Sequence, residues 1–518
     1  MSRETMHIRG TWTQQKILQG RRAQQWAYLL TSLAIVVLTA FLAPAMMGTE
    51  AKSSEQFGAA GNLTTYGFNN AHSNFNSAET NITASTAHQL KQKWAHKTGN
   101  SVTDQPAVAT VGSNTVVFWG SWDGYLHATN VSNNARLWTA LLGQTTDANC
   151  DPPIAGISSS PTVVTINNRQ EVLVGGGDAR LYALDAATGA VIWKTQFPGS
   201  SPSVYIWSSP TVFNGSIYIG SSSFGDCPLT QGQLLQLDAA TGQIIHQFNA
   251  VPNGCTGGGI WDTPTIDEAT GKLYVTTGTQ SKCTGPRVYA PALIEVDATD
   301  ISHFLDAWVI PKNQWVYDSD FGFTPTLFQQ TINGTVTPMV GVANKNGIYY
   351  AFNRARIGSG PLWQVQIAKP GACPQCGDGS LASSAWDGQT LYVAGGITTI
   401  NGQNCRGNLR AINPNNMVIG SPSTVPDPKP KYLWQDCLHN GPVLGSVTVA
   451  GTTPSAEIVA VSQGNTVTVA SAATGKTLAS LSDHQHNSLL YAPPTIANGV
   501  LYVGNMDGNL YAYSINGA

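Results

Sequence analysis

The chain has 518 residues, a formal net charge of −3 and only 11% charged residues. With so little charge and no basic run in its repeats it is a poor candidate for nucleic-acid binding, which needs clustered Lys and Arg. Its 53 Gly and 14 Trp indicate a folded chain rich in turns and sheets, and exclude a disordered one.

The first 50 residues differ from the rest. Basic residues precede an uncharged apolar run at 27–48; they are Arg9, Lys16, Arg21 and Arg22. This order is typical of an export signal, and a run of about 20 apolar residues can also span a bilayer as an uncleaved anchor. We predict a basic cytoplasmic segment at 1–26, a signal peptide or transmembrane anchor at 27–48, a linker at 49–62 and an extracytoplasmic domain at 63–518.

Residues 156–197 read as four short strands joined by tight turns. β-branched pairs such as Val163–Val164 are bounded by Gly, Asn and Asp, which is the pattern of strands and turns. One four-stranded antiparallel sheet has two apolar faces. It therefore needs similar sheets beside it to bury them.

The chain repeats this unit. A Pro after small residues opens it at Pro106, Pro161, Pro210, Pro264, Pro325 and Pro494. Turns of sequence AATG recur at 186–189, 239–242 and 472–475. A Trp marks the fourth strand at Trp94, Trp138, Trp193, Trp308, Trp363 and Trp434. Four strands repeated every ~40–60 residues are typical of a β-propeller.

Counting the units predicts an all-β propeller with eight blades of four antiparallel strands. The blades are expected at 101–142, 156–198, 207–249, 260–311, 321–368, 380–437, 442–481 and 490–515. The last has three strands of its own, so we predict that Gln92–Lys97 completes it and closes the ring. The unit at 442–481 is the least regular, and seven blades is the alternative count.

The eight cysteines lie between positions 150 and 437, in the part predicted to be exported, where disulfides are stable. The sequence does not choose among the possible pairings, but we expect the local pairs Cys255–Cys283 and Cys405–Cys437. Cys373 and Cys376 have CxxC spacing without the His that a c-type haem needs. We expect a structural staple there, with a redox pair as the alternative.

The repeated AATGxxxW pattern resembles the pyrroloquinoline quinone (PQQ) repeat family. The opening YGFNNAHSNFNSAETNIT…LKQKW at 66–94 is similar to that of quinoprotein dehydrogenases, nearest the polyvinyl-alcohol dehydrogenase branch. The resemblance covers 63–515 and implies an eight-bladed propeller. The family includes alcohol dehydrogenases and also propellers without catalytic activity.

Three stretches resemble the cofactor site of those dehydrogenases. They are GGGIWDTPTIDEATGKLYVTTGTQ at 257–280, WVYDSDFGFTPTLF at 315–328 and ANKNGIYYAFNR at 343–354. The resemblance implies that Trp261 is a flat floor under the quinone and that Lys345 contacts the quinone oxygens. It implies that Asp320, with Asp318 as the alternative, is the catalytic base. The structural alternatives are a core aromatic, a turn Lys and a capping Asp.

The calcium site that the resemblance implies departs from the family pattern. Asp320 would be one ligand. Asp226 replaces a Glu, and Thr279 stands in a turn where the family has Asn. Ca²⁺ requires several oxygen ligands, so we expect a Ca²⁺ site of Asp320, Asp226 and Thr279 that is weaker than in the family. Many members also have an adjacent Cys pair, whereas Cys150 has no neighbouring Cys.

Two functions remain open. The first is an exported, PQQ- and Ca²⁺-dependent dehydrogenase that oxidises a small or polymeric alcohol by hydride transfer. It would pass electrons to a separate acceptor, since the sequence has no c-type haem motif. The second is a non-catalytic binding or scaffold propeller at the cell envelope. Trp261, Asp320 and Lys345 favour the enzyme, and the substitutions at Asp226 and Thr279 favour the scaffold.

Overall fold

The structure is a computed structural model that describes residues 61–199, 203–278, 283–420, 431–483 and 487–518. The predicted basic segment, the predicted signal or anchor at 27–48 and nearly all of the linker lie outside these residues. Within the described ranges, no helix has the length and apolar character needed to cross a membrane.

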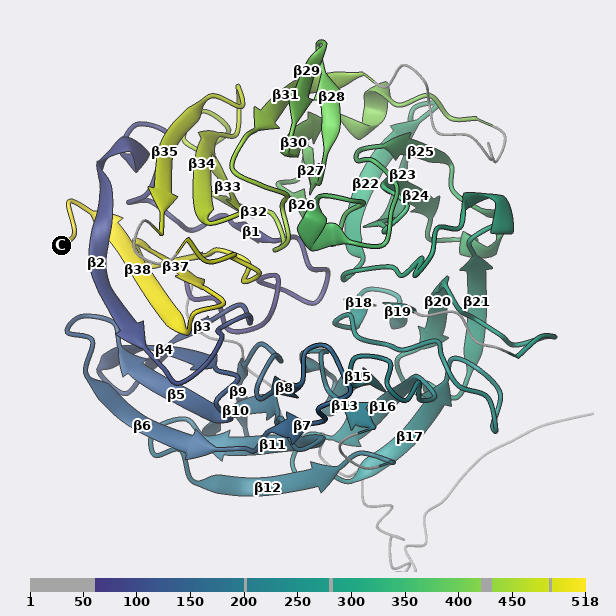
Figure 1. The fold of residues 1–518 in the computed structure, drawn as a ribbon, viewed down its shortest axis with the longest axis horizontal. Helices are drawn as coiled ribbons and strands as arrows, with labels where there is room; N and C mark the ends of the chain where they lie inside the picture. The colour runs from purple at the N-terminus through teal and green to yellow at the C-terminus, as the bar shows by residue number, and fades with distance from the viewer. Residues whose placement is uncertain (1–60, 200–202, 279–282, 421–430, 484–486) are drawn as a thin grey trace, which may run out of the picture. The chain divides into compact units, whose positions relative to one another are not determined.

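Eight antiparallel sheets stand around a common axis, as the repeats predicted (Figure 1). Blades one to four consist of β3 (Ala107–Val111), β4 (Asn114–Gly120), β5 (Tyr125–Asn130) and β6 (Arg136–Leu141); β9 (Thr162–Ile166), β10 (Arg169–Gly175), β11 (Arg180–Asp185) and β12 (Val191–Gln196); β14 (Thr211–Phe213), β15 (Ser216–Ser223), β16 (Gln233–Asp238) and β17 (Ile244–Asn249); and β18 (Thr265–Asp267), β19 (Lys272–Thr276), β20 (Ala292–Asp297) and β21 (Phe304–Val309).

The second half continues the pattern, and the irregular unit at 442–481 is a true blade. Blades five to eight consist of β22 (Thr326–Ile332), β23 (Thr335–Ala343), β24 (Ile348–Asn353) and β25 (Trp363–Gln366); β26 (Ala385–Trp386), β27 (Leu391–Gly395), β30 (Gly407–Ile412) and β31 (Tyr432–Leu438); β32 (Thr448–Ala450), β33 (Ile458–Gln463), β34 (Thr466–Ser471) and β35 (Thr477–Ser482); and β36 (Thr495–Ala497), β37 (Val500–Gly504), β38 (Asn509–Ile515) and β2 (Leu90–Lys97).

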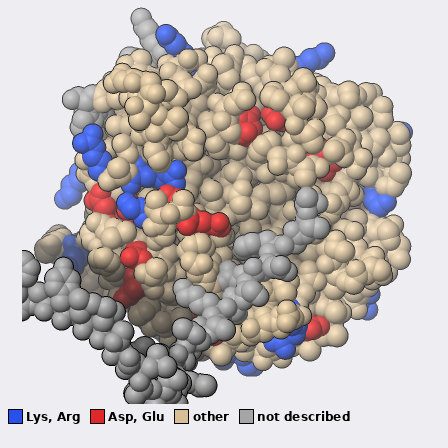
Figure 2. Space-filling view, turned by 180° about the vertical axis from the view of Figure 1, so that it is seen from behind, with Lys and Arg blue, Asp and Glu red and all other residues tan. Residues whose placement is uncertain are grey.

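Short elements decorate the blades. They are β1 (Phe75–Asn76), β7 (Thr145–Thr146), β8 (Ile154–Ala155), β13 (Val204–Tyr205), β28 (Thr398–Ile400), β29 (Gln403–Cys405) and the 3₁₀ turns η1 (Ala87–Gln89), η2 (Lys312–Gln314), η3 (Ile357–Ser359), η4 (Pro374–Cys376) and η5 (Pro414–Asn416). Charge is sparse on the face opposite to the view of Figure 1 (Figure 2).

The ring is closed as predicted. β2 pairs antiparallel with β38 from Leu90↔Ile515 to Lys97↔Asn509, so the closing strand lies within the predicted closing segment at 90–98. A strand from near the start of the domain therefore completes the sheet formed by its end, which removes an open sheet edge.

The repeated Pro lies at a hydrogen bond that joins neighbouring blades near the axis. The Thr that opens the first strand of one blade donates its hydroxyl to the carbonyl oxygen before the first strand of the next. These bonds measure 2.6–3.0 Å and join Thr162 to Pro210, Thr211 to Pro264, Thr265 to Pro325, Thr326 to Ser384, Thr448 to Pro494 and Thr495 to Pro106. Each bond satisfies a buried carbonyl, which would otherwise destabilise the fold.

The AATG turn and the fourth-strand Trp form one contact between neighbouring blades. A Cβ at Gly189 would lie 2.6 Å from the Trp138 ring, and Gly242 and Gly475 face Trp193 and Trp434 in the same way. Each of these glycines has φ of +72°, a conformation that side chains disfavour. Only Gly lets the turn lie flat against the indole, so the repeat keeps both residues.

Residues 63–76, which we call the axial segment, contact all eight blades in turn. The sequence predicted no structure for them. Their backbone or Asn side-chain atoms pair with Val108, Val163, Val212, Ile266, Leu327, Trp386, Val449 and Ile496, one residue in each blade. The backbone turns sharply, with φ of +72° at Phe68, +49° at His72 and +50° at Asn74. The segment therefore links the inner strands of the whole ring.

The eight cysteines form four disulfides. The predicted pairs Cys255–Cys283 and Cys405–Cys437 are confirmed. Cys373 and Cys376 pair with each other. Cys150, which has no neighbouring Cys, pairs with Cys227 across 77 residues. The sequence carried no signal for that pair, since folding alone brings its two loops together.

Candidate functional site

Loops at one end of the blades surround a cavity of about 370 Å³. Trp261 lies in the loop before β18 and lines this cavity together with Phe323, whose ring centroid is 6.0 Å from that of Trp261. Trp261 is partly exposed, whereas the neighbouring Ile260 and Asp262 are buried. Its indole is therefore a wall of the cavity, which disfavours the alternative of one more core aromatic.

The structure brings the other two predicted site residues to this indole. Lys345 lies in the turn between β23 and β24, and its Nζ is 5.9 Å from the centroid of the Trp261 ring. The same Nζ donates to Asp320 Oδ2 at 2.7 Å and to Asp318 Oδ2 at 2.6 Å. Lys345 is 8% exposed and Asp320 is 5% exposed. The site therefore contains a buried ammonium shared by two carboxylates.

The charge of Lys345 depends on these two carboxylates. Burial acts to lower the pKa of Lys345, but Asp320 and Asp318 outweigh it, and its pKa is raised above the ordinary value. The ammonium therefore stays charged at all physiological pH values. Asp318, which the sequence offered only as an alternative to Asp320, acts together with it on Lys345.

Gly278 lets the indole and the carboxylate approach each other. A Cβ at this position would lie 2.6 Å from Trp261 Nε1 and 2.9 Å from Asp320 Oδ1. The backbone is held by a bond from Gly278 N–H to the carbonyl oxygen of Gly259, so it cannot easily move aside. Any side chain here would separate Trp261 from Asp320.

The remaining cavity walls come largely from one position of the repeat. The residue three places before the opening Pro, or before Ser384 in blade six, lines the cavity in most blades; these residues are Thr103, Ser158, Trp207, Trp261, Leu381 and Tyr491. This spacing is a signal that sequence reasoning missed. It would have grouped Trp207 and Tyr491 with Trp261.

Two of the indole N–H groups at the cavity are already bonded within the protein. Trp122 Nε1 donates to Thr103 Oγ1 at 3.0 Å, and Trp207 Nε1 donates to the carbonyl oxygen of Ser223 at 3.2 Å. With those donors bonded, Trp122 and Trp207 offer the cavity aromatic carbon. Flat aromatic molecules pack well in such surroundings.

The predicted metal ligands fare differently. Asp226 lies on the exposed β15–β16 loop with φ of +57°, and Thr279 lies outside the described residues. Among the described residues, no group of three or more His, Cys, Asp and Glu is arranged to hold a metal ion. In this structure the carboxylates of Asp318 and Asp320 both bond the Lys345 ammonium, so the Ca²⁺ site stays a prediction.

Comparisons with known proteins identify the family to which the chain belongs. The family model described as the β-propeller domain of glucose, ethanol and alcohol dehydrogenases (PQQ) matches residues 64–370. The polyvinylalcohol dehydrogenase of Sphingopyxis sp. (strain 113P3) is 26% identical over 324 residues, which are 54% of this chain and 47% of that protein. The quinohemoprotein alcohol dehydrogenase of Comamonas testosteroni is 24% identical over 317 residues, which are 53% of this chain and 42% of that protein.

The matched part thus amounts to less than half the length of these two relatives. The crystal structure of the Comamonas testosteroni enzyme superposes with a TM-score of 0.65 at 19% identity, covering 89% of this chain and 81% of that one. At that identity the similarity shows the fold. The family model matches more than half of the chain, so the chain belongs to the PQQ family of β-propeller domains of glucose, ethanol and alcohol dehydrogenases.

Proposed function

We propose that this chain is a PQQ-dependent dehydrogenase that oxidises an alcohol in the cavity lined by Trp261. One observation carries the proposal: the buried Lys345 ammonium lies 5.9 Å from the Trp261 ring and bonds the Asp320 carboxylate at 2.7 Å. A flat wall, a fixed cation and a carboxylate at one point are what quinone-dependent oxidation of an alcohol requires.

The aromatic lining of the cavity supports the binding of a planar quinone such as PQQ, and the Lys345 ammonium lies beside that lining at Trp261. Trp261 would stack on one face of the planar quinone, and Trp122 and Trp207 would cover other parts of it. Lys345 would donate to a quinone oxygen. When bound, PQQ supplies a carbonyl that accepts a hydride.

The chain's own residues would then handle charge and protons. Lys345 stabilises negative charge that develops on the oxygen it contacts, and it needs no reorganisation because two carboxylates hold it in place. Asp320 would accept the proton of the alcohol hydroxyl at its carboxylate. A bound quinone would displace water from the aromatic walls, which would strengthen both interactions.

Calcium, the alcohol and the electron acceptor remain predictions. A Ca²⁺ site would rest on Asp320, Asp226 and Thr279. The names of relatives include polyvinylalcohol and alcohol dehydrogenases and a lupanine hydroxylase that names cytochrome c. We therefore propose a small or polymeric alcohol as substrate and a separate acceptor. Four disulfides support an extracytoplasmic location, with the segment at 27–48 as its signal or membrane anchor.

A non-catalytic scaffold is the second candidate, favoured by the Asp226 and Thr279 that stand where the family has Glu and Asn. One experiment decides between them. Purified protein is mixed with PQQ, with and without Ca²⁺, and tested for dye reduction with primary, secondary and polymeric alcohols. Quenching of Trp fluorescence by PQQ that weakens in Trp261→Ala is expected. Absence of both quenching and dye reduction rejects the dehydrogenase and leaves the scaffold.

A further inference from the structure

The loop between β25 and β26 packs against the candidate site. The amide of Gly371 donates to the carbonyl oxygen of Lys345 at 3.2 Å, and a Cβ at Gly379 would collide with that same oxygen. Gln375 and Leu381, at the tip and end of the loop, line the cavity beside Trp261. The loop therefore supports Lys345 from behind and forms part of the wall that a bound quinone would touch.

A disulfide closes this loop at the cavity. Cys373 is the N-cap of the 3₁₀ turn η4 and Cys376 is its last residue; this turn lies near the ring axis beside β26 in Figure 1. Cys376 is exposed. By contrast, Cys405 is 2% exposed and Cys150 is 7% exposed, and Cys255 and Cys283 are half-buried. Of the eight cysteines, Cys376 is thus the one that the fold leaves exposed to an external thiol.

This disulfide also adds little to global stability. Its cysteines are 3 residues apart, whereas the other pairs span 77, 28 and 32 residues. Since a disulfide mainly restricts the unfolded chain, and does so more for longer loops, the short one is a weak staple. The turn also keeps backbone bonds of its own, from Cys376 N–H to Cys373 O and from Gly377 N–H to Pro374 O, both at 2.9 Å. Reduction would therefore act locally.

We propose that Cys373–Cys376 is a thiol–disulfide exchange site for an external dithiol, either a small molecule or a dithiol protein, and that its reduction loosens the cavity wall formed by Gln375 and Leu381. The predicted weakening of quinone binding rests on the proposed function. The thiol–disulfide exchange and the loosening of the wall do not rest on the proposed function. They follow from the exposed Cys376 and from the contacts of the loop with Lys345.

The exchange is balanced in two steps. A thiolate of the dithiol attacks Sγ of Cys376, the Cys373–Cys376 bond breaks, and Cys373 leaves as a thiolate that takes up a proton. The second thiol of the reductant then attacks the reductant sulfur that is bonded to Cys376, and Cys376 is released as a thiol. Two electrons and two protons pass to the protein, and the dithiol leaves as a cyclic disulfide.

The test treats the folded protein with increasing dithiothreitol and maps free thiols by alkylation and mass spectrometry. We expect Cys373 and Cys376 to be labelled at a dithiol concentration at least tenfold lower than any other pair. Hydrogen exchange should accelerate in 371–381 and at the Lys345 turn. The Kd of PQQ, measured by Trp quenching, should rise threefold or more, and reoxidation should restore it.

Two double variants complete the design. Cys373→Ser with Cys376→Ser should show the faster hydrogen exchange in 371–381 and the weaker PQQ binding even without reductant. Cys255→Ser with Cys283→Ser should show neither change. Labelling in another order, or labelling without faster exchange in 371–381, overturns the proposal. If PQQ quenches no fluorescence even in the oxidised protein, the proposed function fails, and the alkylation and exchange results alone decide the fate of this site.

Discussion

Two buried ionisable groups in this molecule meet opposite surroundings. Lys345, in blade five, is matched by the carboxylates of Asp318 and Asp320, and its pKa is raised. His127, on β5, is 8% exposed and stacks on Trp119 with ring centroids 4.2 Å apart. Within the described part of the chain, neither of its ring nitrogens has a hydrogen-bond partner. Burial lowers the pKa of His127 to about 4.

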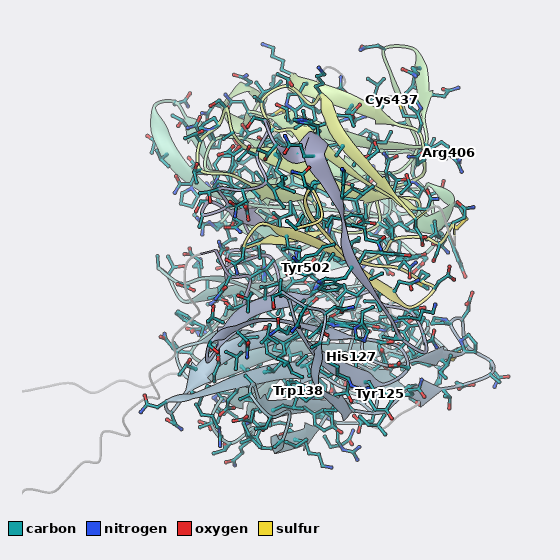
Figure 3. The ribbon with its side chains drawn as sticks, turned by 90° about the vertical axis from the view of Figure 1, so that its left-hand side faces the viewer. Tyr125, His127, Trp138, Arg406, Cys437 and Tyr502 are labelled. Atoms are coloured by element: carbon teal, nitrogen blue, oxygen red, sulfur yellow. A yellow bond between two sulfur atoms is a disulfide. The ribbon has the colours of Figure 1, made fainter. Side chains whose placement is uncertain are left out.

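The difference lies in whether the fold neutralises the buried group or keeps its charge. His127 lies in the seam between blades eight and one, near the ring of Tyr125 at 6.3 Å (Figure 3) and that of His96 at 6.0 Å. There the imidazole is kept neutral and packs as a flat ring. At Lys345 the fold instead places two carboxylates to keep the charge. Because such sites often carry function, the matched charge at Lys345 is the better candidate for a functional group.

Removing the matched charge should have the largest effect. In Lys345→Met, two carboxylates lose their partner, so we expect dye reduction to fall by at least ~100-fold and the free energy of unfolding to fall by about 3 kcal/mol. Steady-state kinetics and urea unfolding measure the two. Lys272→Met, which breaks the pair with buried Glu295, is the control: it should lose stability while PQQ quenching persists. Full dye reduction by Lys345→Met would show that the Lys345 charge has no part in the reaction.

Lowering the pH should destabilise the protein through His127. The pKa of His127 is depressed in the fold and returns to about 6.5 on unfolding. The unfolded chain therefore binds more protons between pH 6.5 and 4, and stability falls as the pH falls through that window, by about 3 kcal/mol at most. His96, Asp123 and Arg136 also act on this ring.

His127→Phe should flatten the decline, as followed by urea unfolding at pH 7 and pH 4.5. The decline should not vanish, because burial also lowers the pKa of His72 to about 4. If the stability of His127→Phe depends on pH as strongly as that of the unmodified protein, then the fold does not lower the pKa of His127.

A smaller change tests the contact of indole and carboxylate. Gly278→Ala places a methyl group 2.6 Å from Trp261 Nε1. Overpacking costs about 1–3 kcal/mol, so we expect PQQ affinity to fall by about 10- to 100-fold, read by Trp quenching. Gly99→Ala, exposed and no closer than 3.2 Å to other atoms, is the matched control. Equal PQQ affinity in the two variants would place the quinone away from Trp261.

The smallest expected effect belongs to the ring of inter-blade bonds. Thr162→Val removes the hydroxyl that donates to the carbonyl of Pro210 at 2.7 Å. One such bond contributes about 1 kcal/mol. Urea unfolding should show that loss, while PQQ affinity stays at the level of the unmodified protein. A change in affinity would mean that the ring of hydrogen bonds positions the cavity walls as well.

Most of the fold was predictable because it is repetitive. The Pro, AATG and Trp signals each reflect a contact made again in successive blades, so eight blades, closure by β2 and two local disulfides could be read from the sequence. The axial segment could not. Its Asn, His and Ser residues have no strand periodicity, and their partners are backbone carbonyls and amides of eight distant strands.

The site was predictable in part. Resemblance singled out Trp261, Asp320 and Lys345, and the structure brings them together. It did not show that Asp318 also binds Lys345, that Cys150 pairs with Cys227, or that Gln375 reaches the cavity. Those contacts join segments that approach only when the ring closes, so no local pattern records them.

The axial segment has a consequence for how the chain is made. It is synthesised before every strand that it will bond, because its partners extend from Val108 to Ile496. Until blade eight is complete, Asn70, Asn74 and Asn76 cannot all be satisfied, and β2 has no sheet to join. The segment can therefore complete its contacts only after the last blade has formed. Its pairing with Val449 and Ile496 joins residues more than three hundred positions apart, and such long-range pairing is the slow part of folding.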